Sequence, residues 1–295
     1  MGRGILLVLL AAMFWGTSGT ASTYAPESAD ALSIGAIRTI VGALGLLVLA
    51  LVEGRGRTRP TWPWLLLFIG AVGTAGGQLA FFTAIERAGV AVSTVLTIGV
   101  APVFTGILSA VYLHHRPGRK WAVATALAVI GASIMVLGTA ETVGGDPAGL
   151  LFGVLGGAGY AIYVTISKKM IDDGHDAVDV TASLFCGAGI LMIPVFFLSD
   201  WQWVLEPRGT AVALYLGLAT NALPNLLFGI GLTMVPVATA ATFALLEPLT
   251  ATMLGVAWLG ERLSGLQWFG VALLLVGLLV LAIPEQLRRN FIRSA

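Results

Sequence analysis

The sequence predicts an all-α integral membrane protein in which ten transmembrane helices form two inverted five-helix repeats. Three observations predict this fold: an apolar composition, a series of membrane-length apolar stretches, and an internal repeat. Hydrophobic residues make up 57% of the 295 residues and charged residues 11%, whereas a soluble domain carries about 25% charged residues. The chain therefore has too little polar surface for a water-soluble globule, and we expect the lipid bilayer to surround it.

Ten apolar stretches each approach the ~20 residues that a transmembrane helix needs. Arg3 and the following ILLVLLAAM are typical of a signal peptide, but the apolar stretch continues without a cleavage site, so we interpret it as the first helix. Charged segments separate the later stretches. The predicted spans are 4–23, 31–52, 63–85, 90–113, 120–138, 147–167, 178–198, 209–233, 237–259 and 265–284.

Basic residues gather on one side of the predicted membrane, which indicates the orientation. That side carries Arg3, Arg55, Arg57, Arg59, Arg116, Arg119, Lys120, Lys168, Lys169, Arg288, Arg289 and Arg293. The opposite loops hold Arg87, Arg208 and Arg262 beside Glu27, Asp30, Glu86, Glu141, Asp146, Asp200, Glu206 and Glu261. Because cytoplasmic loops carry an excess of Lys and Arg, we expect both termini in the cytoplasm and residues 288–295 to form a basic cytoplasmic tail.

The second part of the chain repeats the pattern of the first. When Ala88–Leu113 is aligned with Met234–Leu259, Pro102 falls on Pro248. A short polar turn and then a tryptophan follow each proline in the same order. Chance similarity between two apolar segments does not readily produce three matches in register, so the pattern indicates a true internal repeat.

Each half of this repeat contains five spans. The sequence predicts the first repeat at 1–140 and the second at 141–287. Because five is odd, the second half crosses the membrane in the opposite sense to the first. Inverted repeats of this kind are typical of secondary transporters, whose substrate site lies near the midplane between the halves.

Glu247 lies near the middle of the apolar run 237–259. A carboxylate at that depth costs several kcal/mol unless it is paired, hydrated or protonated, so it marks a functional site by default. It either binds a proton or a substrate amine, or it is a structural acid that is paired with Arg38 or hydrogen-bonded to neighbouring helices. Pro248 removes a backbone donor and is expected to disturb the helix where irregular backbone can line a cavity. The equivalent residue of the first half is Ala101, which favours a specific role for Glu247.

Other residues are expected to have structural roles. Arg38 lies deep in the second span and must face the protein interior. We expect it chiefly to fix neighbouring helices as an ion-pair partner, with binding of a substrate carboxylate as the alternative. Pro102 and Pro248 shape their helices. Two pairs with small-xxx-small spacing predict close helix packing: Gly73 with Gly77, and Gly153 with Gly157.

Polar and aromatic side chains deep in the spans are the remaining candidates for contact with a substrate. The amides of the third span and those of the eighth lie in equivalent spans, so the repeat places them on opposite walls of one cavity. Aromatic residues of the first and sixth spans are likewise expected to face each other and form apolar walls. Interhelical hydrogen bonds and packing are the structural alternatives. The predicted substrate-binding residues are Trp15, Gln78, Thr97, Tyr160, Tyr163, Asn221, Asn225, Thr242 and Glu247.

Several other classes of function lack the residues that they need. A single cysteine, Cys186, excludes an internal disulfide and a cysteine-built metal site. His114, His115 and His175 fall in loops, so we expect neither an intramembrane enzyme nor a metal or other cofactor. No GxxxxGK[ST] loop is present for ATP. The basic residues lie in short blocks between apolar runs, which does not indicate nucleic-acid binding. A passive channel stays open as an alternative.

The second-span segment AIRTIVGAL, the segment EPLTATMLGVAWLGERLSGLQWFGVALLLVGLLVL and the five-plus-five repeat resemble the EamA family of the drug/metabolite transporter superfamily. The first half departs from the family pattern, because Ala101 replaces the glutamate before the proline and HHR replaces the Gly-Glu turn. The resemblance implies a transporter that exports small metabolites, commonly amino acids, across a bacterial inner membrane. It makes protons a candidate coupling partner.

The charge count favours amino acids as the small-molecule substrate. The predicted pathway holds roughly one acid and one base, which suits a zwitterion better than a phosphorylated sugar that would need several Lys or Arg. We expect transport by alternating access. The alternative is a multidrug exporter for lipophilic cations, with Glu247 as the counter-charge and Trp15, Tyr160 and Tyr163 as the aromatic wall.

Overall fold

The structure is a computed structural model that describes residues 2–52, 61–137, 146–258, 260 and 262–283. Within these residues every regular element is a helix, and ten spans are long and apolar enough to cross a membrane. The predicted all-helical fold with ten spans is therefore confirmed. The join between the predicted repeats lies outside the described residues, as do Arg55, Arg57, Arg59, Glu141, Glu261, Arg288, Arg289, Arg293 and the predicted tail 288–295.

Each span of the first half is one helix, whereas two spans of the second half are divided. The first half contains α1 (Gly2–Ser22), α2 (Ala31–Val52), α3 (Trp64–Ala88), α4 (Val90–Val111) and α5 (Arg119–Leu137). The second half contains α6 (Pro147–Asp172), α7 (Ala177–Leu198), η1 (Gln202–Leu205), α8 (Pro207–Leu214), η2 (Tyr215–Ala222), α9 (Leu223–Leu232), α10 (Val237–Phe243), α11 (Leu246–Trp258) and α12 (Gly265–Ala282). The eighth span is α8–η2–α9, and the ninth is α10–α11.

Local sequence explains where several helices begin. Asp146 caps α6 by accepting a hydrogen bond from the backbone N–H of Ala148, and proline occupies the start of that helix. Ser264 and Gln267 form a capping box at the start of α12. Such caps satisfy backbone donors that have no partner within the helix.

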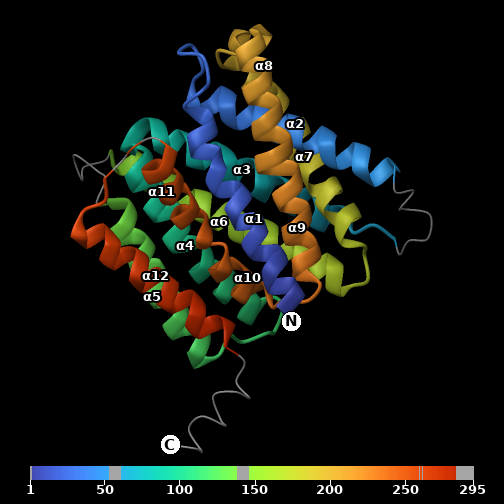
Figure 1. The fold of residues 1–295 in the computed structure, drawn as a ribbon. Helices are drawn as coiled ribbons and strands as arrows, with labels where there is room; N and C mark the ends of the chain where they lie inside the picture. The colour runs from blue at the N-terminus through green and yellow to red at the C-terminus, as the bar shows by residue number, and fades with distance from the viewer. Residues whose placement is uncertain (1, 53–60, 138–145, 259, 261, 284–295) are drawn as a thin grey trace, which may run out of the picture.

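The packing of the helices follows the repeat. In the first half α1 packs against α9 and α11 of the second half, and in the second half α6 packs against α3 and α4 of the first. The second and seventh spans pack together, as do the fifth and tenth, which lie side by side as α5 and α12 in Figure 1. Exchanging the two halves therefore maps each of these contacts onto another, as two related five-helix units require.

Glycines bring the paired helices close together, as the small-xxx-small spacing predicts. A Cβ atom placed on Gly159 of α6 would lie 2.5 Å from the Cα of Gly77 in α3. Between α5 and α12, a Cβ atom on Gly131 would lie 2.4 Å from the backbone nitrogen of Leu274. Larger residues at these positions would force the helices apart, so glycine sets how closely the two halves fit together.

Irregular backbone is confined to the eighth and ninth spans among the described membrane helices. In the eighth, the π-helix η2 ends at Ala222, and Pro224 follows in the first turn of α9. Because proline cannot donate to a preceding carbonyl, a wider hydrogen-bond pattern there is expected. π segments that interrupt an α-helix are frequent at functional sites.

The ninth span differs in detail from the prediction. The sequence predicts a disturbance at Pro248, but the helix breaks before it, at residues 244–245, and α11 begins at Leu246. Pro248 thus occupies the first turn of α11, where its missing N–H would have no helical partner in any case. Pro102, its repeat equivalent, lies inside the continuous helix α4.

Candidate functional site

A cavity of about 150 Å³ lies between the two halves and draws its lining from both. The first four spans contribute to it, together with the sixth to ninth. Most of the residues predicted from the sequence to contact a substrate line this cavity, and Arg38 lines it with them. These residues are Trp15, Arg38, Gln78, Thr97, Tyr160, Tyr163, Asn221, Asn225 and Glu247.

Glu247 reaches the cavity from the first turn of α11, directly after the break in the ninth span. Its backbone N–H donates to the carbonyl of Ala244 at 2.9 Å, which closes the turn between α10 and α11. Backbone N–H groups in the first turn of a helix have no helical acceptor, and they form the positive end of the helix dipole. The break therefore gives this carboxylate a polar setting within an otherwise apolar span.

Arg38 is tied to the irregular part of the eighth span by two hydrogen bonds that run in opposite directions. Its Nη2 donates to the carbonyl of Thr220 at 3.1 Å, and Asn221 Nδ2 donates to the carbonyl of Arg38 at 3.0 Å. The opposite charges of Arg38 and Glu247 attract each other. Yet no salt bridge within 4.0 Å joins the two in the part of the chain that the structure describes. The backbone of η2 holds the guanidinium instead.

A hydrogen-bond chain continues from η2 into α9 and across to α6. Asn225 Nδ2 donates to both the carbonyl and the side-chain oxygen of Asn221, at 2.7 and 2.8 Å. The hydroxyl of Tyr163 donates to Oδ1 of Asn225 at 3.2 Å. Both asparagines are buried, and a buried amide without partners would be costly. The chain thus fixes the polar wall of the cavity in one geometry.

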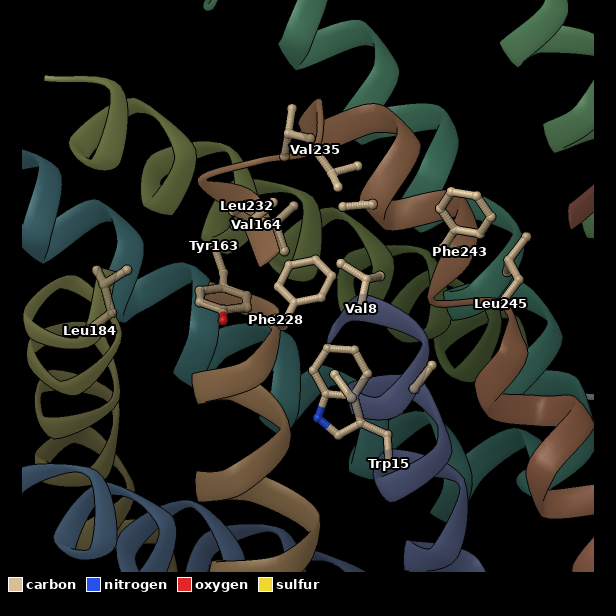
Figure 2. Packing of buried hydrophobic residues seen from close by; sticks show 14 of the residues in the cluster. Val8, Trp15, Tyr163, Val164, Leu184, Phe228, Leu232, Val235, Phe243 and Leu245 are labelled. Atoms are coloured by element: carbon tan, nitrogen blue, oxygen red, sulfur yellow. The ribbon is translucent and has the colours of Figure 1, made fainter. Parts of the chain in front are cut away.

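Aromatic rings form another wall, and the expected meeting of the first and sixth spans is present. The ring centroids of Trp15 and Tyr160 are 6.3 Å apart in an edge-to-face arrangement. Phe228 of α9 lies 5.3 Å from Trp15 and 6.3 Å from Tyr160, and Figure 2 shows its ring between those of Trp15 and Tyr163. Edge-to-face and offset pairs of this kind add to the stability that burial alone provides.

Polar residues of α3 and α4 complete the lining. Gln78 comes from α3, which is the repeat equivalent of the eighth span that carries the two asparagines. Amides from both halves therefore line one cavity. From α4, Thr97 donates to the carbonyl of Gly153 in α6 at 3.0 Å, and Thr94 lies one turn before it. This wall therefore offers hydroxyl and amide groups to a small solute.

Three residues singled out in the sequence lie outside the lining. Thr242 is fully buried and shares a 2.8 Å hydrogen bond with Thr125 of α5. Pro102 and Pro248 are buried within α4 and α11. These three residues contribute to helix geometry and helix contacts, and none of them contacts the space in the cavity.

The lining also contains residues outside the predicted substrate-binding set, namely Thr74, Gly77, Phe81, Thr94, Ile98, Gly156 and Phe185. Helical spacing could have indicated Thr74, because it lies four residues before Gln78 on the same face of α3. No comparable signal marks Phe185, since it is one of many apolar residues in the seventh span. Only the packing of α7 against the other half brings it to the cavity.

The described residues contain no group of three or more His, Cys, Asp or Glu that could hold a metal ion. His175 instead stacks on Trp62, with ring centroids 4.9 Å apart. The site is thus a small chamber with one acid, one base, several amides and an aromatic wall. A multi-pass helical protein with such a chamber between two repeats belongs to the class of membrane transporters.

Comparison with known proteins identifies the family within this class. The EamA-like transporter family matches residues 2–137 and 147–283, so the chain belongs to the EamA-like transporter family of the drug/metabolite transporter superfamily. The two matches correspond to the two halves seen in the packing. This is a family of transporters and not of enzymes.

Relatives along almost the whole length are also transporters. The chain is 42% identical over 277 residues to the uncharacterized transporter YwfM of Bacillus subtilis (strain 168), covering 94% of this chain and 93% of that protein. It is 30% identical over 269 residues to the threonine/homoserine exporter RhtA of Escherichia coli (strain K12), covering 89% and 85%. It is 24% identical over 294 residues to the uncharacterized inner membrane transporter YicL of Salmonella typhimurium, covering 97% of each.

A solved crystal structure has the same fold. It superposes with a TM-score of 0.78 at 18% sequence identity, covering 95% of this chain and 97% of that chain. At this level of identity the likeness concerns the fold alone.

Proposed function

We propose that this protein is a secondary transporter that exports small metabolites, above all amino acids, across the bacterial inner membrane by alternating access. The observation that carries the proposal is the cavity between the two halves, which presents one acid and one base, Glu247 and Arg38, to a small solute. An amino acid carries one charge of each sign, so it matches this lining. The relative RhtA, named for export of threonine and homoserine, supports the same substrate class.

The size of the cavity favours small metabolites over the multidrug alternative. A cavity of about 150 Å³ is comparable to an engineered one that holds benzene. Drug-sized ligands occupy pockets of roughly 300–1,000 Å³. A lipophilic cation of that size would need a much larger chamber than the one between these helices. The aromatic wall therefore fits the apolar part of a small substrate better than a large drug.

We propose that both termini lie in the cytoplasm. Arg3, Arg116 and Lys168 represent the basic segments at one end of the spans, and the positive-inside pattern places that end in the cytoplasm. In Figure 1, α1 begins and α12 ends at the same end of the bundle. Both termini are then cytoplasmic. The relative YicL, an inner membrane transporter, supports the same membrane.

Counterflow in proteoliposomes tests the proposal. Purified protein is reconstituted, each liposome batch is loaded with one unlabelled amino acid, and entry of the labelled form is followed. A carrier gives a transient accumulation of label that saturates with external concentration, whereas a channel gives none. Liposomes without protein provide the baseline. Absence of counterflow with every amino acid would overturn the assignment as an amino-acid transporter.

A further inference from the structure

The cavity holds two opposite charges that are kept apart. Arg38 from α2 and Glu247 from α11 both line it, and no salt bridge within 4.0 Å joins them among the described residues. Opposite charges in an environment of low dielectric constant gain most by direct contact. Something must therefore hold each side chain in place or fill the space between them.

Backbone contacts set the positions of the two charged residues. Arg38 is tied to η2 through the carbonyl of Thr220 at 3.1 Å and the amide of Asn221 at 3.0 Å. The backbone of Glu247 is positioned by the break between α10 and α11, where its N–H bonds to the carbonyl of Ala244 at 2.9 Å. Both anchors lie in the two irregular spans of the second half. The separation of the charges is thus built into the backbone.

Two donors in the cavity wall have no partner. The described residues offer no hydrogen-bond acceptor to Nε of Arg38 or to the hydroxyl of Tyr160, although both atoms are buried. Buried polar atoms without partners are rare in native proteins, and each requires an explanation. Both belong to residues that line the cavity, so an acceptor that enters the cavity would satisfy them.

We propose that Arg38 and Tyr160 receive the carboxylate of a free α-amino acid while Glu247 receives its ammonium group, so that the site selects a small zwitterion by both ends. This inference rests on the proposed function and narrows its substrate class. Bound in this way, the substrate neutralises both fixed charges and satisfies the two free donors. Its side chain then faces the aromatic wall, where Trp15 limits its size.

Molecules with only one charge fit this arrangement poorly. A cation that binds Glu247 leaves the guanidinium of Arg38 unpaired in the same small chamber and is repelled by it. An anion that binds Arg38 meets the same difficulty with Glu247. Binding one end of the site without the other leaves an uncompensated buried charge, which is strongly unfavourable.

Charge-altered analogues of the transported amino acid test the inference on the unmodified protein. In the counterflow assay, the methyl ester keeps the ammonium and blocks the carboxylate, whereas the N-acetyl derivative does the reverse. Each is expected to compete at least about tenfold more weakly than the parent amino acid. If either competes as well as the parent, the two-ended site is wrong while the proposed transport of amino acids stands. If no amino acid gives counterflow, both proposals fall.

Two variants separate recognition of charge from a structural role of the arginine. Arg38→Lys keeps the charge but loses the planar fork that binds a carboxylate through two N–H groups, and Arg116→Lys is the matched control on an exposed loop residue. Arg38→Lys is expected to weaken competition by the amino acid about tenfold and to leave competition by its methyl ester unchanged. Equal weakening of both, or no change in either, would contradict the proposal. If Arg38→Lys does not fold, the analogue series on the unmodified protein still decides.

Discussion

The fourth and ninth spans occupy equivalent places in the two repeats, yet they differ in what their prolines do. Pro102 lies inside α4, which continues unbroken from Val90 to Val111. In the ninth span the chain turns at residues 244–245, and Pro248 falls in the first turn of a new helix. The same residue type in the same register therefore accompanies a continuous helix in one half and a divided one in the other.

The difference lies in the hydrogen bonds before the proline. In the ninth span, the N–H groups of Leu245 and Glu247 bond to carbonyls only three residues earlier, at 3.1 and 2.9 Å. Glu247 follows directly on this tighter turn and lines the cavity. In α4 the equivalent Ala101 is buried and does not line the cavity. A proline permits a break, but the surrounding packing decides whether one forms.

The third and eighth spans show the same contrast. The third is the regular helix α3, whereas the eighth contains the π-helix η2 with Asn221 near its end. Arg38 bonds to the backbone of η2, and Glu247 follows the other irregularity. The second half thus supplies the irregular backbone that anchors both charges, and the first half supplies Arg38 and most of the regular wall.

The largest expected effect concerns the carboxylate that only the second half carries. Glu247→Gln removes the charge with little change in size, and we expect the initial rate of counterflow to fall by at least about tenfold. The reason is that the substrate ammonium loses its counter-charge. Glu206→Gln, at an exposed position before α8, is the control and should keep the full rate. Equal rates in the two variants would make Glu247 dispensable for transport.

Placing an acid at Ala101, the first-half equivalent of Glu247, tests the same comparison in the opposite direction. Ala101 is 8% exposed and lies against α6, where a Cβ on Gly157 would be 3.1 Å from its backbone nitrogen. Ala101→Glu therefore buries a carboxylate outside the cavity, and we expect a loss of about 3 kcal/mol in stability. Ala101→Gln controls for size. Thermal unfolding in detergent measures both, and the two variants melting together would contradict a charge effect.

A smaller effect is expected from the glycine contacts, which also differ between the halves. A Cβ on Gly159 would lie 2.5 Å from the backbone of Gly77, whereas a Cβ on Gly231 in the equivalent contact meets the side chain of Val8 at 2.8 Å. Backbone cannot yield as a side chain can, so Gly159→Ala should lower stability by about 2 kcal/mol and Gly231→Ala by less. A Cβ on Gly76 would have no atom within 4 Å, so Gly76→Ala should not lower the stability of the protein. The reverse order of the melting temperatures would refute this account.

The smallest effect concerns the start of α6, which Asp146 caps. Arg87 donates a 2.9 Å hydrogen bond to Asp146, and this bond, helped by the N–H of Ala148, lowers the pKa of that carboxyl. A lowered pKa in the folded state contributes stability above the ordinary carboxyl pKa, and this contribution is lost as the pH falls through the lowered value. The melting temperature of the unmodified protein should thus exceed that of Asp146→Asn slightly at neutral pH, and this difference should shrink as the pH falls below the ordinary carboxyl pKa. A difference that persists in acid would exclude the ionised carboxylate as its source.

Most of the fold and much of the cavity lining could be predicted because they follow from local signals. The length of each apolar run marks a span. A polar residue within such a run, such as Gln78 or Asn225, is expected to face the protein interior, because lipid offers it no hydrogen-bond partner. The prediction included Thr242, which instead bonds to Thr125, and it missed Phe185. A hydroxyl group can find a hydrogen-bond partner, and an apolar ring can pack, equally well at a helix contact and at a cavity wall. The sequence spacing of such residues therefore does not show which of these two places they occupy.

The sequence by itself determined that the chain is a ten-span membrane protein built from two related halves, because the cost of exposing polar groups to lipid acts on each segment separately. Only the tertiary structure decided that the ninth span breaks before Glu247, that the eighth contains a π-helix, and that Arg38 bonds to its backbone. These features depend on contacts between helices that are far apart in the chain. A cavity is the space that such contacts leave unfilled, so its shape is a property of the whole assembly of helices.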